Sequence, residues 1–154
     1  MTTPSATGRA ACRSVVLALT IALTAAAAAT PAAGATYVDK RANMCVAKAG
    51  GGCGTGIVVK YWYPAGAASQ RGVGWVYASK SPVNKKTTYR ARWTYKAPGK
   101  PVKAASGWKR AVSKGDFVET HWGRDGHTGP QVPKGTKVCI QFKGHRPQAC
   151  VTLA

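Results

Sequence analysis

Apolar and polar residues alternate along much of the chain after residue 36, and the alternation is clearest in the segment Thr87–Lys96, "TTYRARWTYK". One set of alternate positions is apolar and mostly aromatic: Tyr89, Ala91, Trp93 and Tyr95. The other set is polar and mostly cationic: Arg90, Arg92, Thr94 and Lys96. Because successive side chains of a strand point to opposite faces, this pattern predicts a strand with an aromatic core side and a cationic outer side.

Similar short runs of aromatic and β-branched residues recur between segments rich in Gly, Pro, Asn and Ser. The predicted strands are Asn43–Ala47, Ile57–Tyr63, Val73–Ser79, Thr87–Lys96, Trp108–Val112, Phe117–Trp122, Lys137–Lys143 and Ala149–Leu153. Helical periodicity is not sustained anywhere after residue 36, and no internal repeat is present. We therefore expect an all-β fold, a single antiparallel β-sandwich of immunoglobulin-like proportions over residues 36–154.

Residues 1–35 follow a different pattern. Arg9 and Arg13 precede an Ala-rich apolar run that ends near Thr30, and small residues stand at Ala33 and Ala35. This order is typical of a secretory signal peptide cleaved after Ala35. The run is too short and too weakly apolar for a membrane anchor, so we expect no stable membrane insertion. Ala-rich export signals are common in high-GC bacteria, and we expect a secreted, extracellular bacterial protein.

Four cysteines follow the predicted signal peptide: Cys45, Cys53, Cys139 and Cys150. An even number of cysteines in an exported chain predicts two disulfides, and four cysteines allow three connectivities. The spacing favours the local pairs Cys45–Cys53 and Cys139–Cys150. The spacings CxxC and HxxxH are absent, so the cysteines do not indicate a zinc site.

The charge of the chain is strongly unbalanced, with 23 Lys and Arg against four Asp and Glu. Removing residues 1–35 would take away two of the basic residues and none of the acidic ones, leaving a net charge of +17. Such a charge predicts an anionic partner: a cell-wall acidic polymer, nucleic acid or another anionic surface. The alternative is that the cations only keep the protein soluble and discourage edge-to-edge pairing of strands. The predicted binding residues are Arg90, Arg92, Lys96, Lys109 and Arg110.

Three of the four acidic residues lie within or just before the stretch "ETHWGRDGHTG", which also contains two of the three histidines. A carboxylate, an imidazole and a guanidinium in one place are suited to proton transfer during phosphodiester cleavage. The candidate catalytic residues are Glu119, His121, Arg124 and His127; strand parity places only the first two on one face. A divalent ion held by His121, Asp125 and His127 is a second interpretation, but their spacing matches no ligand signature. A third is a turn that balances charge. We expect no metal and no cofactor.

These features support one leading function and two alternatives. The leading prediction is a non-enzymatic binding module for extracellular polyanions. The first alternative is a small secreted ribonuclease or other hydrolase that uses Glu119 and His121. The second is an inhibitor of an extracellular protease that presents the hairpin "CIQFKGHRPQAC" as a rigid loop. Among the tryptophans, Trp62 in "YWY" is the best candidate for a surface ring that stacks on a base or sugar.

Overall fold

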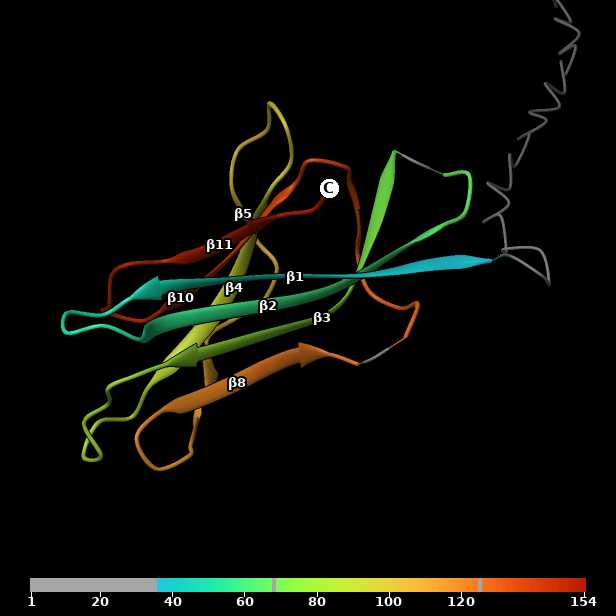
Figure 1. Cartoon of the computed structure of the whole chain (residues 1–154). Coiled ribbons are helices and arrows are strands. Elements are labelled where there is room, and N and C mark those ends of the chain that lie inside the picture. The colour runs from blue at the N-terminus through green and yellow to red at the C-terminus, as the bar shows by residue number, and fades with distance from the viewer. Residues whose placement is uncertain (1–35, 68, 125) are drawn as a thin grey trace, which may run out of the picture. The chain divides into compact units, whose positions relative to one another are not determined.

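A computed structural model describes residues 36–67, 69–124 and 126–154 (Figure 1). The predicted signal peptide and Asp125 lie outside the described residues. Within them the structure has strands and no helix. The strands are β1 (Tyr37–Ala47), β2 (Cys53–Pro64), β3 (Gln70–Lys80), β4 (Arg90–Lys96), β5 (Lys103–Ala104), β6 (Lys109–Arg110), β7 (Val112–Ser113), β8 (Val118–Gly123), β9 (Gln131–Pro133), β10 (Lys137–Phe142) and β11 (Ala149–Thr152).

The strands form two antiparallel sheets. Sheet A has the order β1-β2-β3-β8-β7, and β9 also pairs with β3. Sheet B has the order β11-β10-β4-β5, and β6 also pairs with β4. In Figure 1, β4 crosses behind β2 and β3. In the described part of the chain, no helix is long and apolar enough to cross a bilayer.

One hydrophobic core takes side chains from both sheets. Sheet A contributes Ile57 and Val59 of β2 together with alternate residues of β3, and sheet B contributes Trp93 and Ile140. The alternation predicted for β4 is confirmed, because Ala91 and Trp93 are buried while Arg90 and Lys96 are exposed. The predicted inward face of the final hairpin is confirmed in the same way, with six buried side chains: Val138, Ile140, Phe142, Ala149, Val151 and Leu153.

One predicted strand is wrong. The segment Trp108–Val112 is divided into β6, which pairs with β4 in sheet B, and β7, which pairs with β8 in sheet A. The chain passes from one sheet to the other at Ala111, whose amide donates to the Tyr89 carbonyl oxygen at 2.9 Å. The pattern also missed β5 and β9, because strands of two or three residues are too short to show an alternation.

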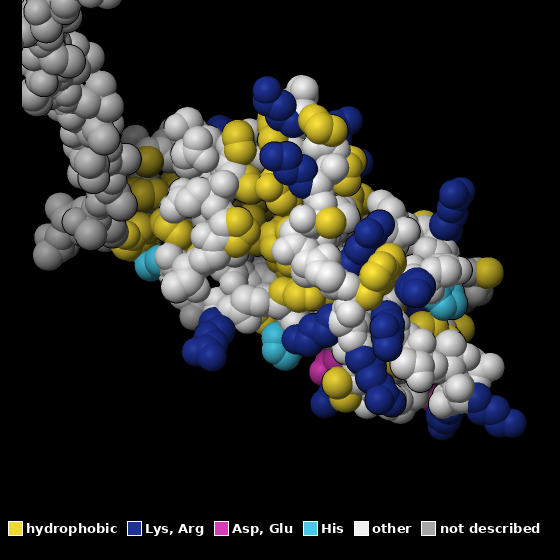
Figure 2. All heavy atoms as spheres, turned by 180° about the vertical axis from the view of Figure 1, so that it is seen from behind, with side chains coloured by type: hydrophobic (Ala, Val, Ile, Leu, Met, Phe, Trp, Pro, Cys, Tyr) yellow, Lys and Arg dark blue, Asp and Glu magenta, His cyan; other side chains and the backbone are white. Residues whose placement is uncertain are grey.

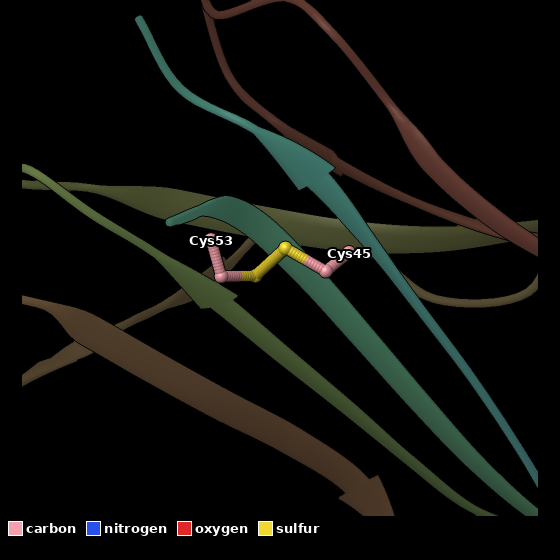
Figure 3. The surroundings of a disulfide bond; sticks show 2 residues. All are labelled: Cys45 and Cys53. Carbon is pink, nitrogen blue, oxygen red and sulfur yellow. A yellow bond between two sulfur atoms is a disulfide. The ribbon is translucent and has the colours of Figure 1, made fainter. Parts of the chain in front are cut away.

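Two disulfides join neighbouring strands. Cys45–Cys53 links the end of β1 to the start of β2 (Figure 3), with 5.5 Å between the Cα atoms. Cys139–Cys150 joins residues directly opposite each other on β10 and β11, with 4.0 Å between the Cα atoms. These are the two local pairs that the spacing favours. Gly56 gives the first disulfide room, because a Cβ there would lie 2.8 Å from Ser79 Oγ and 3.4 Å from Cys53 Sγ.

Candidate functional site

The outer face of sheet B carries a row of cations. Arg90, Arg92 and Lys96 point away from the core because the intervening positions of β4 face inward. The pairing of β6 with β4 sets Arg110 directly opposite Arg90. The pairing of β10 with β4 sets Lys137 directly opposite Lys96. We call these five residues the cationic face: Arg90, Arg92, Lys96, Arg110 and Lys137.

No acidic side chain is present in the strands of sheet B. The four acidic residues stand at positions 39, 116, 119 and 125, outside all five of these strands. Like charges directly opposite each other destabilise an antiparallel pair. The pairs Arg90–Arg110 and Lys96–Lys137 therefore repel one another, and a bound anion would relieve that repulsion. Figure 2 shows Lys and Arg side chains spread over the face opposite to the view of Figure 1, with very little acidic surface.

Arg92 is held in place within the cationic face. Its Nε and Nη2 both donate to Gln141 Oε1, at 3.2 and 3.0 Å. Its guanidinium also lies 4.6 Å from the centre of the Trp108 ring, which is a cation–π contact. An arginine held in this way loses less side-chain entropy when it binds an anion than a free one would.

Lys109 lies apart from the other predicted binding residues. It pairs with the inward-facing Ala91 rather than with one of the outward cations. Its ammonium group donates to the His121 carbonyl oxygen at 2.8 Å, so it reaches from sheet B to sheet A. Four of the five predicted binding residues thus share one face, and Lys109 links the two sheets beside it.

Glu119 and His121 lie on the outer face of sheet A, as strand parity predicts. Glu119 Oε2 accepts a hydrogen bond from the Tyr77 hydroxyl at 2.8 Å, and Glu119 Oε1 lies 3.7 Å from Lys114 Nζ. His121 is exposed, and its ring centre lies 6.3 Å from that of Trp75. The Glu119 carboxylate thus contacts Tyr77 of its own sheet and Lys114 in the turn between β7 and β8.

His127 and Arg124 do not join this pair. His127 Nε2 lies 3.0 Å from Asp39 Oδ1 on β1, and its ring centre lies 4.0 Å from that of Tyr37. Arg124 is exposed and makes no hydrogen bond or ion pair with other described residues. The four candidate catalytic residues are therefore dispersed over the face. Of the proposed metal ligands, Asp125 lies outside the described residues, which contain no group of three or more such side chains placed to hold an ion.

Glycines hold the loop from Arg124 to Pro130 against β3. A Cβ on Gly74 would lie 2.7 Å from the Gly126 carbonyl oxygen. A Cβ on Gly123 would overlap the carbonyl oxygen of Gly74, and one on Gly129 would overlap that of Val73. The glycines of "GRDGHTG" therefore allow backbone to pack directly on backbone. This close approach carries His127 over β2 to Tyr37 and Asp39.

The prediction that Trp62 is a surface stacking ring is wrong. Its side chain does lie on the outer side of β2, but only 6% of the residue is exposed. The loop covers it, and its Nε1 donates to the Thr128 carbonyl oxygen at 3.3 Å. Tyr37 covers it edge-on, with 5.2 Å between ring centres. Trp75 on β3 is the partly exposed tryptophan of this face, which parity alone could not distinguish from Trp62.

Tyr77 is expected to ionise at unusually high pH. Burial, and then its hydrogen bond to Glu119, raise the pKa of Tyr77 from 10.0 to about 12. Because the pKa of Tyr77 is higher in the folded than in the unfolded protein, the protonated Tyr77 hydroxyl stabilises the folded state. This stabilisation is complete below about pH 10 and is lost as the pH rises through about 12. Following phenolate absorbance, we expect Tyr77→Phe to remove a tyrosine titration with a midpoint at about pH 12. Glu119→Gln should lower that midpoint only part of the way, since the burial remains. An unchanged titration at this pH in Tyr77→Phe would contradict the assignment.

The hairpin between β10 and β11 folds back on the protein. His145 stacks on Tyr89, with ring centres 5.1 Å apart and 29° between the ring planes. Burial, and then the positive charge of Lys80, lower the pKa of His145. The proposed inhibitory loop is therefore anchored at His145.

No family model matches the chain, and neither a curated protein nor a solved structure matches it.

Proposed function

We propose that this protein is a secreted, non-enzymatic module that binds extracellular polyanions through its cationic face. The partner classes are a cell-wall acidic polymer, nucleic acid or an anionic surface. The observation that carries the proposal is the pairing of cation with cation, Arg90 with Arg110 and Lys96 with Lys137, on a sheet without an acidic residue. Such a surface has no internal counterion, and an external polyanion supplies one.

The proposal includes export of the protein and a β-sandwich architecture for the exported domain. Residues 1–35 act as a signal peptide, and the exported domain is a β-sandwich of immunoglobulin-like proportions. Two disulfides support the extracellular location, because disulfides persist in oxidising compartments. The bacterial origin rests on the Ala-rich composition of the signal.

The shape of the cationic face favours a linear polymer over a small ion. From Arg90 to Lys96 the strand extends about 20 Å, at about 3.3 Å per residue. A polymer lying along β4 meets several cations in succession and releases its condensed counterions as it binds. Arg92 supplies the fixed contact, while the exposed lysines adapt to the spacing of the charges.

Charge reversal on β4 is expected to weaken binding of a fluorescent duplex oligonucleotide. The variant Arg90→Glu/Arg92→Glu should lower affinity about tenfold to thirtyfold and reduce the slope of log K against log salt by about 2, because two phosphate contacts are lost. Fluorescence anisotropy at several salt concentrations measures both quantities. Circular dichroism reports whether the variant folds, and Lys96→Glu/Lys137→Glu is the second variant if it does not.

The matched control is Lys40→Glu/Lys48→Glu, which makes the same change in net charge at two exposed residues near sheet A. We expect the control to reduce affinity much less than the β4 variant. Binding that ignores salt, or equal losses in both variants, would contradict the proposal. Repeating the titration with an acidic polysaccharide and with anionic vesicles ranks the partner classes.

Hydrolysis and protease inhibition stay predictions. Hydrolysis has in its favour the shared face of Glu119 and His121, but the Glu119 carboxylate is engaged by Tyr77. Arg124, which would stabilise the charge of the transition state, makes no contact with either residue. Inhibition rests on the disulfide-closed hairpin alone.

A further inference from the structure

The outer face of sheet A differs in chemistry from the cationic face. The registers of β1, β2, β3 and β8 align its outward side chains in rows that cross the sheet. The first row is Arg41, Lys60 and Trp75. The second row is Asn43, Val58, Tyr77 and His121. Cations therefore lie at one end of this surface and aromatic rings lie at its centre.

Trp75 and Tyr77 form a stacked, partly exposed aromatic pair on β3, which we call the aromatic platform. Their ring centres are 5.6 Å apart and their planes differ by 20°, and both side chains are partly exposed. The imidazole of His121 borders the platform on β8. The positions around these rings are polar, so the platform is an exposed apolar area with a polar rim. The exposed parts of such rings can pack against the apolar face of a ligand ring.

A hollow of about 270 Å³ lies beside the platform. Its wall includes Asp39 and Arg41 of β1, Lys60 of β2 and Gly126 of the loop. The ammonium group of Lys60, which lines the hollow, lies 5.6 Å from the centre of the Trp75 ring, so the hollow and the platform are neighbours. Arg41 is exposed and makes no hydrogen bond or ion pair with the other described residues. Its guanidinium is thus available to a carboxylate, which it can bind with two parallel hydrogen bonds.

This face also presents hydrogen-bond acceptors. Asp39, whose side chain is 74% exposed, borders the hollow, and Glu119, whose side chain is 29% exposed, borders the platform. Ionised carboxylates accept hydrogen bonds from hydroxyl groups and repel phosphates. The combination of acceptor, cation and exposed aromatic surface matches a ligand that has hydroxyl groups, a negative charge and a ring. A DNA strand, whose sugar hydroxyls are esterified along the chain, offers these carboxylates no hydroxyl donors.

We propose that the outer face of sheet A binds an acidic oligosaccharide. One sugar ring packs against Trp75 and Tyr77 and donates to Glu119, while a neighbouring ring reaches the hollow, where its hydroxyl groups donate to Asp39 and its uronate carboxylate binds Arg41. This site is separate from the cationic face and does not depend on it. The protein then has a sheet that binds polyanions by charge and a sheet that recognises acidic sugars by shape and hydrogen bonding.

The test is a calorimetric titration of the mature protein with tri-galacturonic acid, a linear trimer of uronic acid. We expect binding that Trp75→Ala weakens at least about tenfold, the effect of losing one stacked ring. Arg41→Ala should weaken the acidic trimer and leave its methyl ester unaffected. Arg41 is exposed and has no partner among the described residues, so Arg41→Ala should keep the fold even if Trp75→Ala does not. The control is Val102→Ala, which removes an exposed apolar side chain just before β5 and should leave affinity within about twofold.

Three results would overturn the proposal: no binding at millimolar concentrations, equal binding by Trp75→Ala, or tighter binding of a short oligothymidylate than of the trimer at the same platform. The last result would assign the platform to single-stranded nucleic acid. Failure here is distinguishable from failure of the polyanion proposal. Arg90→Glu/Arg92→Glu should leave the Trp75-dependent binding of the trimer, measured at a salt concentration that suppresses binding by charge alone, unaffected. Trp75→Ala should not affect the duplex oligonucleotide.

Discussion

Gly123→Ala is expected to destabilise the protein by about 3 kcal/mol or more. Gly123 has a φ of +78°, where a side chain costs about 1 kcal/mol, and its Cβ would also overlap the Gly74 carbonyl oxygen. The atom that this Cβ would meet belongs to the backbone of β3, which cannot move aside as a flexible side chain could. Urea denaturation with intact disulfides measures the free energy of unfolding.

Gly144→Ala is the control for Gly123→Ala. Gly144 has nearly the same φ, +74°, but no atom lies within 4 Å of its added Cβ. Gly144→Ala should therefore lower the free energy of unfolding only by the conformational cost, about 1 kcal/mol. The difference between the two variants then measures the close approach of β8 to β3. Equal losses would show that the overlap is relieved without cost and that the loop is not held by this contact.

Arg71→Ala is expected to cost about 3 kcal/mol, because it removes a buried and hydrogen-bonded guanidinium. Only 3% of Arg71 is exposed. Its Nε donates to the Ala154 carbonyl oxygen at 2.8 Å and its Nη1 to the Gln70 carbonyl oxygen at 2.7 Å. The guanidinium also lies 4.0 Å from the centre of the Tyr63 ring. The substitution leaves these carbonyl oxygens without their donor and opens a cavity.

Arg71→Met separates the two contributions, since methionine keeps most of the packing and none of the hydrogen bonds. We expect its stability to lie between the native protein and Arg71→Ala. Exchange of the Leu153 amide, which donates to Thr136 at 3.0 Å, should accelerate in both variants because the last residues lose their anchor. Arg124→Ala, at an exposed arginine, should be within about 0.5 kcal/mol of the native protein. A native-like Arg71→Met would show that the hydrogen bonds of Arg71 contribute nothing to stability.

Local patterns predicted those features that depend on one strand or one hairpin. The faces of β4 follow from alternation between Tyr89 and Lys96, and the Cys139–Cys150 pair follows from the parity of a short hairpin. The pairing of Arg110 with Arg90 depends on how residues 97–108 return to β4, and nothing in their composition specifies that path. The burial of Trp62 depends on a loop about sixty residues later in the sequence that covers its side chain. A local pattern of residues therefore could not predict it.

The candidate catalytic cluster shows the same limit. Glu119 and His121 share a face because they are two residues apart on one strand. His127 instead contacts Tyr37 and Asp39, because the glycines allow the backbone of its loop to pack closely on β3. Proximity in sequence to Glu119 therefore gave no information about where the imidazole would lie.

The placement of the acidic residues has a consequence for how the molecule turns in an electric field. Asp39 and Glu119 lie in sheet A, Asp116 lies in the turn before β8, and sheet B has no acid in its strands. The protein therefore has a permanent dipole moment whose positive end is at sheet B. Near a negatively charged surface this moment exerts a torque, and the molecule arrives with sheet B leading. Trp75 and Tyr77, on the outer face of sheet A, then face away from that surface.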